Sequence, residues 1–312
     1  MKKLALTGFS DEISPVFDEQ LAALKEFGVS YLELRGADGV NVSDLSPEKL
    51  KEIKRKLKET GISVSSIGSP IGKISIEDDF AAHMEKLKRT LEIQKELNAP
   101  YLRMFSFYLP KENPTEQYRE QVLEQVGKMV EEAARWESVL LHENEKGIYG
   151  DTAPRCLDLM RQLSSPSFRA VFDFANFVEV GQDTLEAYEV LHPYIEYVHI
   201  KDCATAETTA EKRIVPAGQG DGHLREILAD LLHGGWRGFL SLEPHLIDFT
   251  GLAALEQNAK KRDSALDGKS AWKLALDSLC GILRELPEVR VTGAEPESPH
   301  SGPFGRFLPF PL

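Results

Sequence analysis

The stretch V-F-D-F-A-N-F, residues 171–177, places a single carboxylate, that of Asp173, inside an otherwise apolar run. The length of the run and its valine and phenylalanine content are typical of a buried strand. A buried carboxylate costs several kcal/mol unless a partner compensates its charge. We therefore predict a strand whose end carries a functional aspartate.

Similar apolar runs alternate along the chain with longer charged segments of helical period. The predicted strands are 4–9, 30–35, 63–67, 101–105, 139–143, 170–174, 194–200 and 239–243. The predicted helices begin near Ser14, Ser46, Glu77, Asn113, Thr152, Asp183, Asp221 and Thr250. Strict alternation of this kind predicts an α/β fold, a single-domain (β/α)8 TIM barrel. A doubly wound open sheet is the alternative, but G-F-S-D-E replaces its usual Gly-rich first turn.

Local signals mark where several of the helices begin and end. The dipeptides Ser46-Pro47 and Asn113-Pro114 each combine a capping side chain with a proline suited to the first helical position. Gly28 and Gly61 each follow an amphipathic charged segment, as expected of a left-handed residue that ends a helix.

Residues 1–286 are predicted to form the barrel, and residues 287–312 a C-terminal tail. The tail is rich in Pro, Gly and Ser and ends in F-G-R-F-L-P-F-P-L, so we expect it to be extended. The N-terminal sequence MKKLALTGFSDEIS is interpreted as a strand rather than a signal peptide, because it lacks a small-residue cleavage site.

Charge and cysteine content limit the classes of partner and the cellular compartment that we expect. The net charge of −13 disfavours a nucleic acid or an anionic membrane surface as the main partner. No apolar stretch is long enough to cross a bilayer. The three cysteines are widely spaced and form no C-x-x-C motif, which predicts free thiols and a cytoplasmic location.

Four successive predicted strands end in a side chain that can bind a metal: Glu143, Asp173, His199 and Glu243. Because strand side chains alternate and the carboxyl ends of barrel strands share one rim, we expect these four to converge. Three carboxylates brought together would repel one another, and a divalent cation removes that repulsion. Three carboxylate oxygens and one imidazole suit Mn²⁺, Mg²⁺ or Co²⁺, and Zn²⁺ is possible. Taken singly, each residue could equally be a solvated rim residue, a helix cap or a core histidine.

With these residues in view, the chain resembles the xylose isomerase-like TIM-barrel superfamily over about residues 3 to 285. The resemblance rests on Glu143, on Asp173 in D-F-A-N, on His199 in H-I-K-D and on Glu243 in L-E-P. The stretches G-S-P-I-G-K and L-R-M-F-S also look like bacterial members described as sugar phosphate isomerase/epimerase.

The resemblance implies a divalent-metal-dependent isomerase or epimerase of a sugar, sugar phosphate or sugar acid in carbohydrate metabolism. It assigns the metal, with manganese among the candidates, to the four strand-end residues. Glu143 and Glu243 would be the acid/base pair, moving a proton through a metal-bound cis-enediolate. A homo-oligomer is possible by analogy. Asn176, Tyr149 and Thr205 stand where ketose 3-epimerases carry His, Glu and Arg, so a free ketohexose is not the expected substrate.

Further polar residues at the predicted rim are candidate substrate contacts. They are Glu33, Lys73, Arg103, Asn176, Lys201, Asp202 and His223. Each has an ordinary alternative, such as a surface lysine for Lys73, charge balance for Arg103 or a turn cap for Asp202.

Three other functions remain open. An inosose-type dehydratase would use the same metal site but expel a hydroxide. An apurinic endonuclease would need additional histidines where Ser66 and Arg103 stand, and the acidic charge opposes DNA. A non-catalytic binding barrel would have no reason to carry the full ligand set.

Overall fold

The structure is a computed structural model that describes residues 4–110, 112, 114–206, 209–249 and 265–286. Within these residues, eight parallel strands form one sheet. The strands are β1 (Ala5–Gly8), β2 (Tyr31–Leu34), β5 (Ser63–Ile67), β6 (Tyr101–Met104), β7 (Val139–Glu143), β8 (Phe168–Asp173), β9 (Ile195–Ile200) and β12 (Phe239–Leu242). Their order in the sheet is β1-β12-β9-β8-β7-β6-β5-β2. A parallel bridge between Phe9 and Glu33 joins the two edge strands, so the sheet is a nearly closed barrel.

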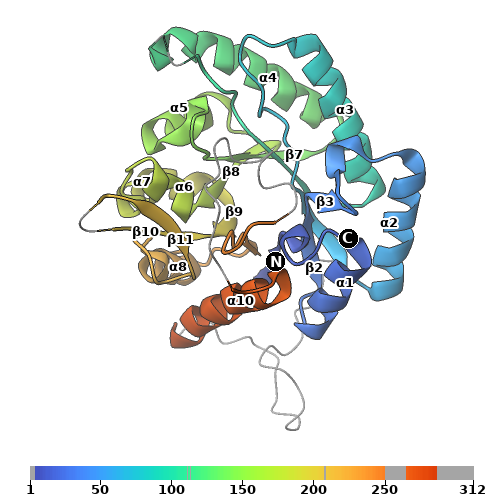
Figure 1. The fold of residues 1–312 in the computed structure, drawn as a ribbon. Helices are drawn as coiled ribbons and strands as arrows, with labels where there is room; N and C mark the ends of the chain where they lie inside the picture. Colours follow the sequence, from blue (N-terminus) through green and yellow to red (C-terminus); the bar gives the residue numbers. More distant parts are fainter. Residues whose placement is uncertain (1–3, 111, 113, 207–208, 250–264, 287–312) are drawn as a thin grey trace.

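Helices follow the strands and surround the sheet, which confirms the predicted TIM barrel (Figure 1). The described helices are α1 (Phe17–Glu26), α2 (Pro47–Thr60), α3 (Phe80–Glu96), α4 (Arg119–Arg135), α5 (Ala153–Leu163), α6 (Phe174–Glu179), α7 (Thr184–Leu191), α8 (Leu224–His233) and α10 (Gly268–Glu285). The short helix α6 was not predicted and follows β8 directly, with Asp173 as its cap. None of the described helices is long and apolar enough to cross a membrane.

The predicted helix signals hold where the structure describes them. The side chain of Ser46 accepts a hydrogen bond at the start of α2, and Gly28 and Gly61 both have a φ of +71°. Asn113 and Thr250 lie outside the described residues. The nearest described α-helices begin at Arg119 and Gly268. The predicted tail, residues 287–312, also lies outside the described part.

A cluster of buried, mostly aromatic residues forms one layer across the strands of the barrel. It consists of Ala5, Tyr31, Tyr101, Leu141, Val171, Tyr197 and Phe239. Tyr101 and Tyr197 meet edge to face, with their ring centroids 5.9 Å apart. The members of this layer are buried, and the next inward side chain on several strands is polar and also buried. The fold therefore concentrates buried polar groups at the carboxyl ends of the strands, where TIM-barrel sites lie.

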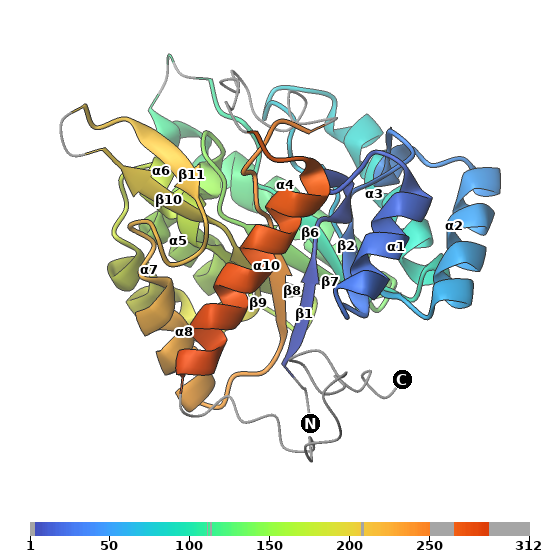
Figure 2. The same cartoon turned by 60° about the horizontal axis from the view of Figure 1, so that its bottom comes forward.

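Two antiparallel hairpins extend that rim. One pairs β3 (Gly36–Ala37) with β4 (Val40–Asn41), and the other pairs β10 (Asp202–Thr205) with β11 (Lys212–Val215). Figure 2 shows the second hairpin at the end of the barrel toward which the strands point.

Candidate metal centre

The structure brings together the four side chains that the sequence predicts as metal ligands. Glu143 ends β7, Asp173 ends β8, His199 lies near the end of β9, and Glu243 follows β12. One ligand atom from each lies within 4.8 Å of the others, and all four residues are buried. The register places Asp173 directly beside His199, and Ser241 on the other side of His199.

The imidazole of His199 has a different partner on each nitrogen. Its Nδ1 atom lies 3.0 Å from Oε1 of Glu143, 3.4 Å from Oε2 of Glu243 and 3.8 Å from Oδ2 of Asp173. Its Nε2 atom lies 3.1 Å from Oε2 of Glu33. A carboxylate on the outer nitrogen fixes the ring and leaves the inner nitrogen to a cation. Glu33 thus holds His199 with Nδ1 facing the three carboxylates.

The carboxylates differ in protonation because their neighbours differ. Burial raises the pKa of Asp173 to about 7. The nearby Glu243 and Glu143 add to this rise in pKa, whereas Lys201 opposes it. Burial also acts on Glu143, but His199 and Arg103 outweigh it and lower the pKa to about 2. The pKa of Glu243 is likewise held well below its usual range, by Lys201 and His245 against burial. Asp173 is therefore the carboxylate that most needs a cation.

One further observation fits a divalent cation here. Oδ1 of Asp173 accepts the backbone N–H of Asn176, whereas Oδ2 is buried and has no hydrogen-bond partner among the described residues. Nζ of Lys201 lies 3.0 Å from Oδ2 and forms an ion pair with it. Oδ2 thus faces the other ligand atoms with a lone pair to offer. Three oxygens and one nitrogen in this arrangement could hold a metal.

Three of the predicted substrate contacts adjoin the ligand set. Arg103 donates from Nη1 to Oε2 of Glu143 at 3.0 Å. Nζ of Lys201 lies 3.2 Å from Oε2 of Glu243. Asn176 donates from Nδ2 to the carbonyl of Asn144 at 2.8 Å and, at 3.4 Å, to Oε1 of Glu143. These contacts neutralise or orient the carboxylates.

Lys73 lies at the edge of the site, on the loop after β5. Its Nζ atom lies 2.7 Å from Oε2 of Glu145 and 4.4 Å from the centroid of the Phe105 ring. The neighbouring Gly72 has a φ of +86°, and a Cβ atom there would sit 2.0 Å from the carbonyl oxygen of Phe105. His83 accepts the backbone N–H of Gly72 at 2.8 Å, so this loop is held in place from both sides.

The structure gives the three other candidates different neighbours. Oε2 of Glu33 contacts Nε2 of His199, the nitrogen that faces away from the three carboxylates. Asp202 accepts hydrogen bonds from the backbone N–H groups of Gly218, Gly220 and Gly222, and so shapes the Gly-rich loop. His223 precedes α8 with a φ of +51°, and its Nδ1 atom lies 3.0 Å from Oγ1 of Thr184.

Sequence reasoning missed a set of buried residues beside Glu243. Arg35 pairs with Glu243 and with Asp11 and Glu12, which follow β1. Asn144 was also missed; its side chain exchanges two hydrogen bonds with the backbone of Asp173. Arg35 follows Glu33 by two residues and therefore shares its face, which was the one available signal.

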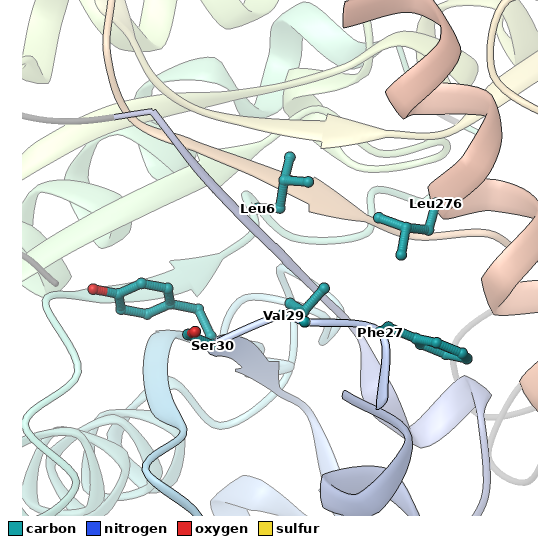
Figure 3. A pocket seen from close by; sticks show the side chains of 7 residues that line it. Leu6, Phe27, Val29, Ser30 and Leu276 are labelled. Atoms are coloured by element: carbon teal, nitrogen blue, oxygen red, sulfur yellow. The ribbon is translucent and has the colours of Figure 1, made fainter. Parts of the chain in front are cut away.

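A small pocket elsewhere offers no comparable chemistry. It lies between α10 and the segment that joins α1 to β2 (Figure 3). Its walls are Leu6, Phe27, Gly28, Val29, Ser30, Tyr31 and Leu276, none of which is charged. The four-ligand cluster therefore remains the candidate functional site.

Comparisons with known proteins agree with this fold. The 3-dehydroshikimate dehydratase of Bacillus anthracis is 22% identical over 182 residues, a match that spans 58% of this chain and 65% of that enzyme. A D-allulose 3-epimerase from Methylomonas sp., solved in complex with D-allulose, superimposes with a TM-score of 0.70 at 15% identity, covering 90% of this chain and 98% of that one.

A xylose isomerase-like TIM barrel protein from Mycobacterium smegmatis, solved in complex with magnesium, superimposes with a TM-score of 0.62 at 17% identity, covering 89% of this chain and 98% of that one. The family model for the xylose isomerase-like TIM barrel matches residues 21–265. The chain therefore belongs to the xylose isomerase-like TIM barrel family.

Proposed function

We propose that this protein is a divalent-metal-dependent isomerase or epimerase of a small hydroxylated carbonyl compound, such as a sugar, sugar phosphate or sugar acid. The observation that carries the proposal is the buried cluster of Glu143, Asp173, His199 and Glu243 at the carboxyl ends of the strands. Two of its carboxylates, Glu143 and Glu243, come from strands that are not neighbours in the sheet. A substrate held between them could exchange a proton on either face of one carbon.

The cation expected in this site is Mn²⁺, Mg²⁺ or Co²⁺, with Zn²⁺ possible, since the donors are three oxygens and one imidazole nitrogen. When bound, such an ion supplies Lewis acidity, which favours loss of a proton next to a carbonyl. The magnesium in the Mycobacterium smegmatis structure supports this choice.

The protein's own side chains would perform the proton transfers. One glutamate takes the proton from the carbon next to the carbonyl, and the electron pair forms an enediolate. In an isomerase the same glutamate then delivers the proton to the neighbouring carbon. In an epimerase the other glutamate, in its protonated form, delivers its proton to the opposite face of the same carbon, and the first glutamate keeps the proton that it took. Arg103 and Lys201, each next to a glutamate, keep that glutamate ionised and oriented.

A dehydratase is the second candidate, and the similarity to 3-dehydroshikimate dehydratase favours it. The first step is the same proton abstraction. The electron pair of the enolate then expels a hydroxyl group from the adjacent carbon, and an acid supplies the proton that lets it leave as water. The substrate would be a β-hydroxy ketone. The two reactions therefore differ only after the shared enolate.

Proton exchange in D2O tests both candidates. Mn²⁺-loaded protein is incubated with separate ketoses, ketose phosphates and hydroxy-keto acids, and the products are followed by NMR. Deuterium at the carbon next to the carbonyl, with every hydroxyl retained, indicates an isomerase or epimerase. Loss of water with an enone product indicates the dehydratase. Protein that binds Mn²⁺ but exchanges no carbon-bound proton in any of these substrates would refute the proposal.

Glu243→Gln should reduce turnover by at least about a thousandfold, because the amide cannot accept the proton. Glu196→Gln is the matched control, since Glu196 lies on β9 near the amino end of the strand, where Oε1 accepts the hydroxyl of Tyr101. Equal loss of activity in both variants would remove Glu243 from the mechanism. The barrel boundary at residue 286, the cytoplasmic location and a homo-oligomer stay predictions.

A further inference from the structure

A second acidic cluster lies next to the proposed metal centre and shares one residue with it. Ligand atoms of Glu12, Glu243 and His245 all lie within 4.8 Å of one another, and all three residues are buried. Their arrangement alone could hold a cation. The guanidinium of Arg35 already lies there, 3.2 Å from Oε1 of Glu12 and 3.3 Å from Oε1 of Glu243.

Arg35 is held firmly in this position. Its Nε and Nη2 atoms donate to the two oxygens of Asp11 at 2.9 and 3.0 Å, which is the bidentate geometry that suits guanidinium and carboxylate. Its Cζ atom lies 4.3 Å from the ring centroid of Phe9 and 4.8 Å from that of Phe249. Aromatic contacts of this kind stabilise a guanidinium and fix its plane.

The two oxygens of Glu243 have separate surroundings. Oε1 lies 3.3 Å from Nη1 of Arg35 and 3.3 Å from Nε2 of His245. Oε2 lies 3.4 Å from Nδ1 of His199 and 3.2 Å from Nζ of Lys201. One oxygen is therefore anchored outside the four-ligand set while the other faces into it.

The backbone supports the same arrangement. His245 has a φ of +46°, in the left-handed region that residues with a side chain rarely adopt. Its backbone N–H donates to Oε2 of Glu12 at 2.8 Å. Glu12 thus uses one oxygen to hold the segment after β12 and the other to bind Arg35.

We propose that Arg35 is a positioning residue that takes the place of a second metal ion. Its guanidinium neutralises Glu12 and Oε1 of Glu243, so that Oε2 of Glu243 binds the ion of the four-ligand set. The site therefore holds one ion. This inference rests on the proposed function, because it assumes that Glu243 is a metal ligand. Four of the five N–H bonds of Arg35 are directed at Asp11, Glu12 and Glu243. Little donor capacity remains for a substrate anion.

The number of Mn²⁺ ions bound per chain tests the proposal without a substrate. Full-length protein is stripped with EDTA, and Mn²⁺ is titrated by calorimetry and by electron paramagnetic resonance. We expect one ion in the wild type and two in Arg35→Gln and Arg35→Ala, with the exchange-coupled spectrum of a carboxylate-bridged pair. Arg35→Lys keeps the charge and should bind one ion. The double variant Arg35→Gln/Glu12→Gln should also return to one.

Arg119→Gln is the matched control, because Arg119 forms a bidentate pair with Asp158 between α4 and α5, outside the site. It should bind one ion. Wild-type protein that binds no Mn²⁺ would overturn the proposed function and this inference together. One ion in the wild type and still one in Arg35→Gln and Arg35→Ala would overturn the inference alone. So would failure of both variants to fold in millimolar Mn²⁺, since a second ion should replace the missing charge.

Discussion

Glu33→Gln is expected to weaken metal binding while leaving the barrel folded. Oε2 of Glu33 accepts the hydroxyl of Ser241 at 2.7 Å and lies 3.1 Å from Nε2 of His199. Glutamine has nearly the same volume, so no cavity forms. It lacks the negative charge, however, that makes the imidazole a stronger ligand and keeps Nδ1 directed at the carboxylates.

Loss of such a partner typically weakens metal affinity about 10- to 100-fold, which corresponds to about 1.4–2.7 kcal/mol. The stabilisation that saturating Mn²⁺ gives to the folded state should fall by the same amount. For a barrel of this size, 1 kcal/mol shifts the melting temperature by roughly 2–4 °C. The rise in melting temperature on adding Mn²⁺ should therefore shrink by roughly 3–11 °C.

Calorimetric titration with Mn²⁺ and thermal melts with and without Mn²⁺ measure these quantities. Ser241→Ala is the matched control, because it removes the other hydrogen bond to Oε2 but keeps the carboxylate. We expect its Mn²⁺ affinity to change by less than about threefold. A Glu33→Gln protein with wild-type Mn²⁺ affinity and an altered KM would refute this reasoning. Glu33 would then be a substrate contact, as its position at a strand end first suggested.

Two further predictions concern pH. Mn²⁺ affinity should rise as the pH increases toward about 7, because burial raises the pKa of Asp173 to about 7 and its carboxyl must release a proton to bind the ion. Calorimetry in buffers of different ionisation enthalpy would show proton uptake by the buffer. A Mn²⁺ affinity that does not change between pH 5 and 7 would contradict this prediction. The second prediction concerns His83, whose pKa is lowered from 6.5 to about 4 by burial and by the nearby Lys86. The contribution of neutral His83 to stability is therefore present above about pH 6.5 and is lost as the pH falls toward 4. We expect the free energy of unfolding to fall by about 3 kcal/mol from this group over that range, measured by urea denaturation. A His83→Gln variant with the same acid sensitivity as wild type would refute that assignment.

The order of strands and helices could be predicted from the sequence because local sequence signals mark each element. The predicted helix starts near Ser14, Glu77 and Asp221 each lie three residues before the observed ones, at Phe17, Phe80 and Leu224. Capping side chains and glycines act within a few residues, so they are visible in a single sequence. The short helix α6 was missed because its apolar residues continue directly from β8.

The gathering of the four ligands was also predictable. Parallel strands of a barrel end at one rim, and alternation decides which side chains face inward. Glu143, Asp173, His199 and Glu243 each stand near or just after the end of a strand, so their gathering followed once the barrel was recognised.

Which side chains surround those ligands depended on the tertiary structure. Glu33 reaches His199 only in the three-dimensional arrangement of β2 and β9, and the pairing of β2 with β5 shifts register between Leu32 and Glu33. Arg35, which follows β2, meets Glu243, which follows β12, across 208 positions of sequence, because β1 pairs with β12 on one side and bridges to β2 on the other. Periodicity assigns a side chain to a face, but contact distances between faces depend on barrel closure, register and packing, which no local pattern records.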